Sequence, residues 1–191
     1  MGCYVLPVPK PSAIPGARTT LVLSLVLSFI GICGLMRGYG FVSVTADDLD
    51  RAAETNQVFA ARRNLDEAET SSPVLVGVQV GNLLASGLLL FASVLLTARR
   101  RSALWWTQQA LIANILYTLA NIATMTWFSY GHASLVRDTY LALDWPDDVP
   151  VLISHVLGTA FFGLLMLTLY LVLFRVLRRA DVREFVQREA S

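Results

Sequence analysis

The chain has 191 residues, of which 55% are hydrophobic and 15% are charged, and its formal net charge is +1. This composition is too apolar for an ordinary soluble domain, and we expect no nucleic-acid partner. The two cysteines, Cys3 and Cys33, lie in the expected N-terminal tail and first apolar segment, and neither expected outer loop has one, which excludes an external disulfide framework and Cys-pair redox chemistry.

Residues 1–18 are expected to be a flexible, proline-rich tail that precedes the first apolar segment, residues 19–44. Small residues recur on one face of this segment at helical spacing, and we expect this ridge to pack closely on a neighbouring helix of the same subunit. Its members are Ser24, Ser28, Gly31, Leu35 and Gly38, with Gly34 beside them.

The next segment, residues 45–73, is the largest polar stretch of the chain. It begins "TADDLD", where Thr45 suits a helix N-cap and the acidic residues suit the positive helix N-terminus. The spacing of its apolar residues predicts a helix lying near the outer membrane surface.

The second and third apolar segments, residues 74–98 and 104–130, are joined by an arginine-rich turn. Each carries a polar stripe at helical spacing, which must turn away from lipid. The stripes contain Gln79, Asn82, Ser86, Ser93 and Thr97, and then Thr107, Asn114, Thr118, Asn121 and Thr124. We expect the two stripes to face each other, with Asn82 level with Asn121, Ser86 with Thr118 and Thr97 with Thr107. The second segment also contains Gly77-xxx-Gly81, a small face for helix packing within the subunit or between copies.

Residues 131–150 are expected to form a short outer loop that leads into the fourth apolar segment, residues 151–177. Residues 178–191 contain no helix breaker, so the fourth helix is expected to continue into a cytoplasmic helical extension.

Each of the four apolar segments exceeds the ~20 residues needed to cross a membrane. The predicted fold class is therefore all-α, an integral membrane antiparallel four-helix bundle with up-down connections, one domain over residues 19–177. If the termini and the arginine turn share one side, that side holds 10 basic and 3 acidic residues, against 5 and 11 on the other. The positive-inside rule then predicts that both termini are cytoplasmic. Arginine dominates the basic residues, which favours a bacterial inner membrane.

Five polar residues are predicted to lie near one level in the outer part of the membrane: Arg37, Gln79, Asn82, Asn121 and His155. Ionisable groups inside spans are functional-site hypotheses, and Arg37 suits a phosphate, a carboxylate or a quinone carbonyl. The competing interpretation is that Arg37 snorkels to the interface, with the glycines around Tyr39 ending the helix early.

No nucleophile, acid-base or metal-binding pattern is present, and the spans contain no Asp or Glu. We therefore expect no enzyme, catalytic residue, metal or cofactor. The sequence favours a non-enzymatic membrane protein acting through helix-helix contacts, as a subunit or assembly partner of a complex or as a self-associating oligomer. Its expected partners are the lipid bilayer and other membrane subunits or copies of itself. The alternatives are a small channel or carrier with a polar site around Arg37, and, more weakly, a haem- or quinone-associated redox subunit using His132 and His155.

Overall fold

The computed structural model describes residues 16–43, 65, 67–141 and 151–189, and over these residues it is all-helical. Six helices are described, in the order α1 (Ala17–Ser43), α4 (Pro73–Thr97), α5 (Ala103–Gly131), α6 (Ala133–Leu141), α7 (Val151–Leu177) and α8 (Ala180–Glu189). The four long helices are each long and apolar enough to cross a membrane, which indicates a multi-pass membrane protein. This part of the prediction is confirmed.

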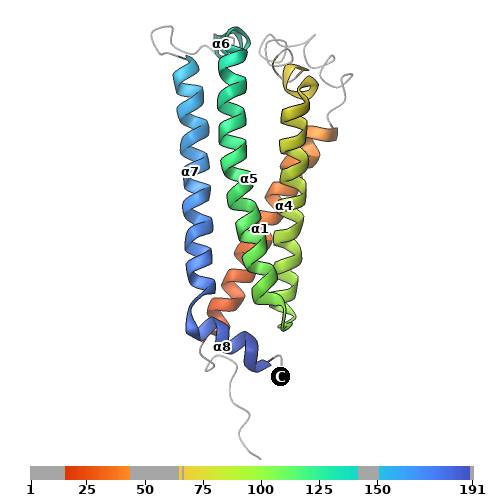
Figure 1. The fold of residues 1–191 in the computed structure, drawn as a ribbon, viewed down its shortest axis with the longest axis vertical. Helices are drawn as coiled ribbons and strands as arrows, with labels where there is room; N and C mark the ends of the chain where they lie inside the picture. The colour runs from red at the N-terminus through yellow and green to blue at the C-terminus, as the bar shows by residue number, and fades with distance from the viewer. Residues whose placement is uncertain (1–15, 44–64, 66, 142–150, 190–191) are drawn as a thin grey trace, which may run out of the picture.

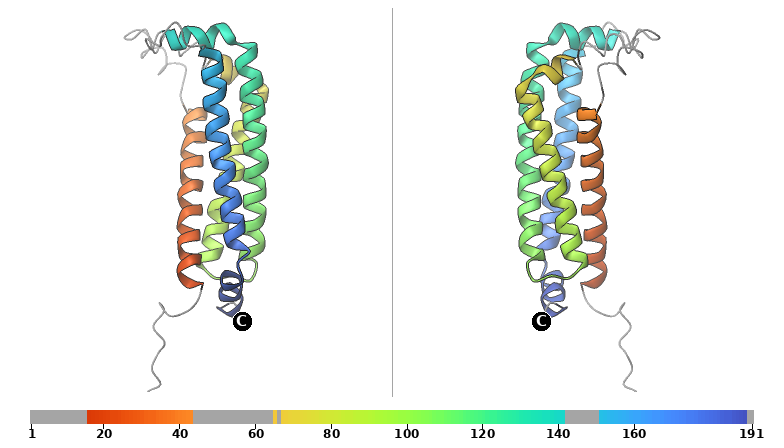
Figure 2. Two further views of the ribbon diagram at one scale, coloured as in Figure 1. Left: turned by 90° about the vertical axis from the view of Figure 1, so that its left-hand side faces the viewer. Right: turned by 90° about the vertical axis from the view of Figure 1, so that its right-hand side faces the viewer.

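The long helices run antiparallel to their neighbours in chain order, with α1 on α4, α4 on α5 and α5 on α7 (Figure 1). The start of α1, the turn between α4 and α5, and α8 lie together at one end, called the α8 end (Figure 2). Gly16 lies against Asp181 and Phe185, and the Arg99 guanidinium lies 5.0 Å from the Phe185 ring centre. The opposite end is called the α6 end, and the two halves of the bundle, which meet at Asn114 of α5, are named after these ends.

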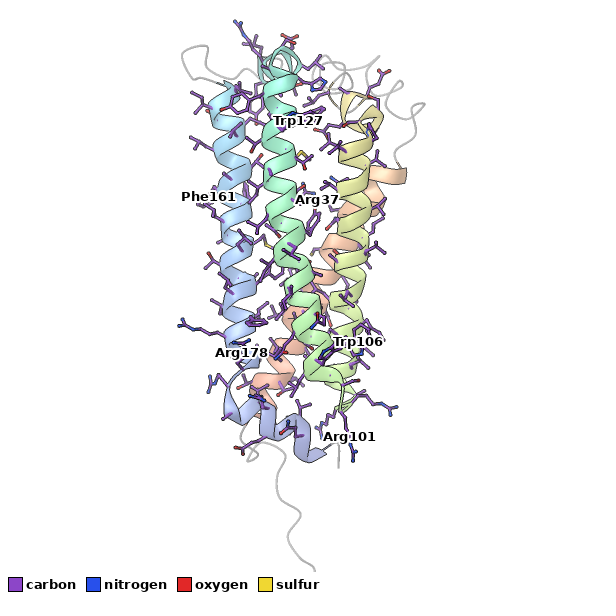
Figure 3. All side chains as sticks on the ribbon, viewed as in Figure 1. Arg37, Arg101, Trp106, Trp127, Phe161 and Arg178 are labelled. Carbon is purple, nitrogen blue, oxygen red and sulfur yellow. The ribbon has the colours of Figure 1, made fainter. Side chains whose placement is uncertain are left out.

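Tryptophans mark both ends of α5, as Figure 3 shows for Trp106 and Trp127. Twenty-one residues of helix separate them, a rise of about 31 Å. This rise matches the ~30 Å hydrocarbon thickness of a bilayer, and tryptophan favours its two interfaces. The distance from these two residues therefore measures depth within the expected membrane.

One large apolar core fills the α8 half and draws on five helices. Its buried members are Leu23, Leu27, Leu89, Ala92, Leu96, Ala103, Ala110, Leu111, Tyr170, Leu173, Leu177, Phe185 and Val186. The amphipathic helix α8 closes this core from below, with Val182, Phe185 and Val186 buried. The prediction that the fourth helix continues past Leu177 is wrong. The chain turns at residues 178–179, because a straight helix would leave the apolar face of α8 in water.

A second, smaller core lies at the α6 end and contains Leu65, Leu75, Phe128 and Val136. Val136 belongs to α6, which lies across this end of the bundle within the stretch expected as a loop (Figure 2). The helix predicted within residues 45–73 falls largely outside the described residues, which show helix only at Leu65 and residues 67–71. The predicted tail also lies outside them, except for residues 16–18.

The fourth long helix, α7, leaves the bundle open on one side of the α6 half. None of its described side chains before Tyr170 is buried, and its main neighbour is α5. In Figure 1, α1 crosses behind the other helices from a position near α7 at the α8 end to the far side at the α6 end. The four helices therefore enclose a core only in the α8 half.

Candidate functional site

The polar stripe of α4 faces α1. Ser24 Oγ lies 2.7 Å from Thr97 Oγ1 and donates to the Ser93 carbonyl at 3.1 Å, and Ser28 Oγ donates to Ser93 Oγ at 2.9 Å. The prediction that this stripe pairs with that of α5 is wrong in its hydrogen bonds and in its register, because Ala85 contacts Asn114, which puts Asn82 about 6 Å from the level of Asn121. Thr107 and Thr118 instead donate to carbonyls of their own helix.

Glycines on α1 explain this choice of partner. A Cβ at Gly31 would lie 2.8 Å from Leu90 Cγ and 3.0 Å from the Ser86 carbonyl, and one at Gly34 would collide with Ser86 Oγ. Glycine at both positions therefore allows α1 to approach α4 this closely. At the contact, Asn82 Nδ2 donates to the Gly34 carbonyl at 3.0 Å, and Ser86 Oγ donates to Asn82 Oδ1 at 3.3 Å. The ridge predicted on α1 thus packs within the subunit, and Asn82, a predicted site residue, has packing partners.

A polar node joins three helices at the boundary of the two halves. Asn114 is only 2% exposed, and its Nδ2 donates to the carbonyls of Ala85 on α4 at 2.9 Å and Ala110 on α5 at 2.8 Å. Its Oδ1 accepts from Tyr170 Oη of α7 at 3.3 Å. Sequence reasoning placed Asn114 on an inward stripe but missed Tyr170. The available signal was a phenol within an apolar span, since a buried tyrosine hydroxyl usually finds a partner.

Beyond this node, on the side of the α6 end, lie polar groups without partners. Gln79 is 3% exposed, and its Oε1 is buried without a hydrogen bond, as is Asn121 Oδ1. Arg37 is exposed and forms no ion pair or hydrogen bond with any described residue, although its charge acts on the Tyr117 hydroxyl. We call Arg37, Gln79, Tyr117 and Asn121 the polar layer.

The helix register puts these residues at similar depth. Ala85 contacts Asn114, and Gly81 lies opposite Tyr117, so Gln79 and Asn121 are level to within about 3 Å. Arg37 and Gln79 each lie three residues beyond the Gly34–Asn82 contact, in helices of opposite direction, and are therefore also level. Three of the five predicted site residues, Arg37, Gln79 and Asn121, therefore lie at one depth in the polar layer.

The layer is deep. Asn121 lies six residues and Tyr117 ten residues before Trp127, a rise of about 9 to 15 Å. Figure 3 shows the Arg37 side chain well inside the bundle's length, in projection between α4 and α5. The helix α1 continues to Ser43 and does not end at the glycines near Tyr39, so one premise of the snorkelling interpretation is removed. A charged side chain at the centre of a span costs about 2.5–3.5 kcal/mol.

The structure does not bring His155 to this layer. Gly163 of α7 lies against Ile122, and His155 is eight residues, or about 12 Å, nearer the α6 end. Its Nδ1 lies 3.1 Å from Tyr140 Oη of α6. Equal depth was expected because each helix was counted from its own start, but α7 begins level with the end of α5.

The second histidine also lies at the α6 end. The His132 ring stacks on Phe128 with a 4.2 Å separation of centres, and its Nδ1 lies 3.2 Å from the Phe128 carbonyl. Both histidines thus have partners within the packing of that end. Among the described residues, no group of three or more His, Cys, Asp or Glu side chains is placed to hold a metal ion.

An apolar furrow of about 580 Å³ runs between α4 and α5, and none of its lining residues comes from α1. Five of its eleven lining residues are glycine or alanine. Its lining residues are Val74, Gly77, Val78, Gly81, Leu84, Ala85, Leu88, Ala113, Leu116, Tyr117 and Ala120. A Cβ added at Gly77 would meet nothing within 4 Å, and one at Gly81 would meet only Tyr117 Cδ2 at 3.9 Å. The Gly77-xxx-Gly81 face, unlike the ridge of α1, is therefore not packed within the chain.

Comparison of the chain with protein-family models, with curated proteins and with solved structures finds no match.

Proposed function

We propose that this protein acts in a membrane through helix-helix contacts, as a subunit or assembly partner of a complex or as a self-associating oligomer. The α8 end, where the described arginines of three segments gather, would face the cytoplasm. The partner would place one transmembrane helix in the furrow between α4 and α5.

The furrow is the observation that carries this proposal. Association of helices in lipid depends on close packing, because lipid tails are as apolar as leucine. Small residues allow such packing, and Gly31, Gly34 and Gly163 serve it inside this chain. Gly77 and Gly81 present the same kind of surface to open space in a furrow lined by apolar side chains. A partner helix in the furrow would pack against Gly77 and Gly81, which no other described helix of the chain covers.

The test is to fill the furrow and measure association. Gly77→Leu and Gly81→Leu are expected to weaken association by about tenfold or more, measured by native mass spectrometry or by co-purification from membranes. Gly87→Leu is the matched control, because Gly87 lies on the same helix, has open space around it and is outside the furrow. Equal association in all three variants would refute the proposal.

A small channel or carrier is the second candidate, and the unpartnered polar layer favours it. Against a pore through one copy stands the node at Asn114 and Tyr170, which fills the centre between three helices. A pore would therefore need several copies, so native mass also tests this candidate. For the redox alternative, an absorbance scan in the Soret region of the purified protein tests for bound haem.

A further inference from the structure

We infer that the polar layer binds a phosphate anion that carries hydroxyl groups, the chemistry of a glycerophosphate head group. This inference does not rest on the proposed function, because Arg37, Gln79 and Asn121 do not line the furrow, and Tyr117 is the one member of the polar layer that does.

The charge of Arg37 selects the anion. None of the four spanning helices contains an Asp or Glu, so no counter-ion is available at this depth from them. Arg37 has no ion pair among the described residues, and it is exposed. Its planar guanidinium can donate two parallel hydrogen bonds to a phosphate. The negative charge of the phosphate would then neutralise the guanidinium within the membrane span.

The two amide oxygens select the hydroxyl groups. Gln79 Oε1 and Asn121 Oδ1 are acceptors without donors, and such groups are costly inside a membrane. Both are buried, so a ligand hydroxyl reaches them by rotation of the amide about its broad terminal torsion. An ammonium donor at this level would be repelled by Arg37, so hydroxyl groups are favoured.

The open side of the α6 half supplies the route. No described side chain of α7 before Tyr170 is buried, and α1 diverges from α7 towards the α6 end (Figure 1). A lipid whose head group lies in the layer would extend an acyl chain along this apolar opening. A free glycerol phosphate has the same head-group chemistry and would enter from the α6 end.

The experiment measures retained ligand by native mass spectrometry after exchange into phosphatidylglycerol, into phosphatidylcholine, or into detergent with free glycerol 3-phosphate. The wild-type protein should retain phosphatidylglycerol at least tenfold better than phosphatidylcholine, which lacks hydroxyl donors. Arg37→Gln should lower the retention of phosphatidylglycerol about tenfold or more. The retention by Arg37→Lys should lie between that of the wild type and that of Arg37→Gln. Arg137→Gln is the matched control, because it removes an exposed arginine of α6 outside the layer.

A second variant separates binding from folding. Asn121→Leu keeps Arg37 but removes one acceptor, so retention of phosphatidylglycerol should fall towards that of phosphatidylcholine. Retention of phosphatidylcholine should be the same as in the wild type. Binding of free glycerol 3-phosphate with the same dependence on Arg37 would support the site and identify a free anion as its ligand. Equal retention of phosphatidylglycerol by wild type, Arg37→Gln and Arg137→Gln would overturn the inference. Gly77→Leu fills the furrow and should leave retention of phosphatidylglycerol unchanged. Failure of the proposed function can therefore be distinguished from failure of this inference.

Discussion

The polar groups of the α8 half and those of the polar layer in the α6 half are treated in opposite ways. In the α8 half, Ser24, Ser28 and Ser93 bond across the contact between α1 and α4, beside a core drawn from five helices. In the α6 half, Gln79 and Asn121 carry buried oxygens without partners, and Arg37 stands exposed and unpaired among the described residues. The same kinds of side chain, at similar helical spacing, thus stabilise one half and leave the other incomplete.

This difference indicates that the residues that stabilise the bundle and the residues available to bind another molecule lie in different parts of the chain. Helices that enclose a core satisfy their own polar groups, whereas a half that one helix leaves open keeps groups available for another molecule. The α8 half, together with the contact of α1 with α4 that extends from it to Gly34 and Asn82, is therefore expected to tolerate substitution poorly. The polar layer beyond that contact is expected to tolerate substitution well when stability alone is measured.

The largest effect is expected at the contact of α1 with α4. Gly34→Leu should lower stability by about 3 kcal/mol, because the new side chain collides with Ser86 and separates Asn82 from the Gly34 carbonyl. Thermal unfolding in detergent measures the change. Gly158→Leu, at a glycine of α7 with open space around it, is the control and should change stability little.

A smaller loss is expected at the node between the halves. Asn114→Leu should cost about 2 kcal/mol, since it removes the bonds to Ala85 and Tyr170 and leaves the phenol hydroxyl buried without an acceptor. The double variant Asn114→Leu, Tyr170→Phe also removes the phenol hydroxyl that has lost its acceptor, so it should recover part of that loss. A double-variant cycle that shows no coupling would contradict the three-helix node.

The smallest effect is expected in the polar layer, and its sign is opposite. Gln79→Met and Asn121→Leu replace a buried, unpartnered amide by an apolar group of similar size, so stability should be unchanged or rise by up to about 1 kcal/mol. The same unfolding measurement applies. A loss as large as that of Asn114→Leu would show that these amides are partnered and would remove the contrast between the halves.

The four apolar helices and the inward polar stripes were predictable from sequence, because lipid leaves a helix no other way to satisfy its amides and hydroxyls. That Arg37, Gln79 and Asn121 all lie well inside the membrane span was also predictable, since rise per residue is fixed within a helix. The register of α4 on α5 was not, because the contact of Ala85 with Asn114 puts Gln79, and not Asn82, level with Asn121. The depth of His155 was not, because the offset between α7 and α5 depends on where Gly163 packs on Ile122.

The sequence by itself determined which side chains turn away from lipid, since each stripe is a property of one helix. Only the tertiary structure decided which helix each stripe meets. Spacing alone makes α1 and α5 equal candidates for the stripe of α4, and the close approach allowed at Gly31 and Gly34 selected α1. The same choice left Gln79 and Asn121 without partners, because α1 diverges from α7 before the α6 half can close.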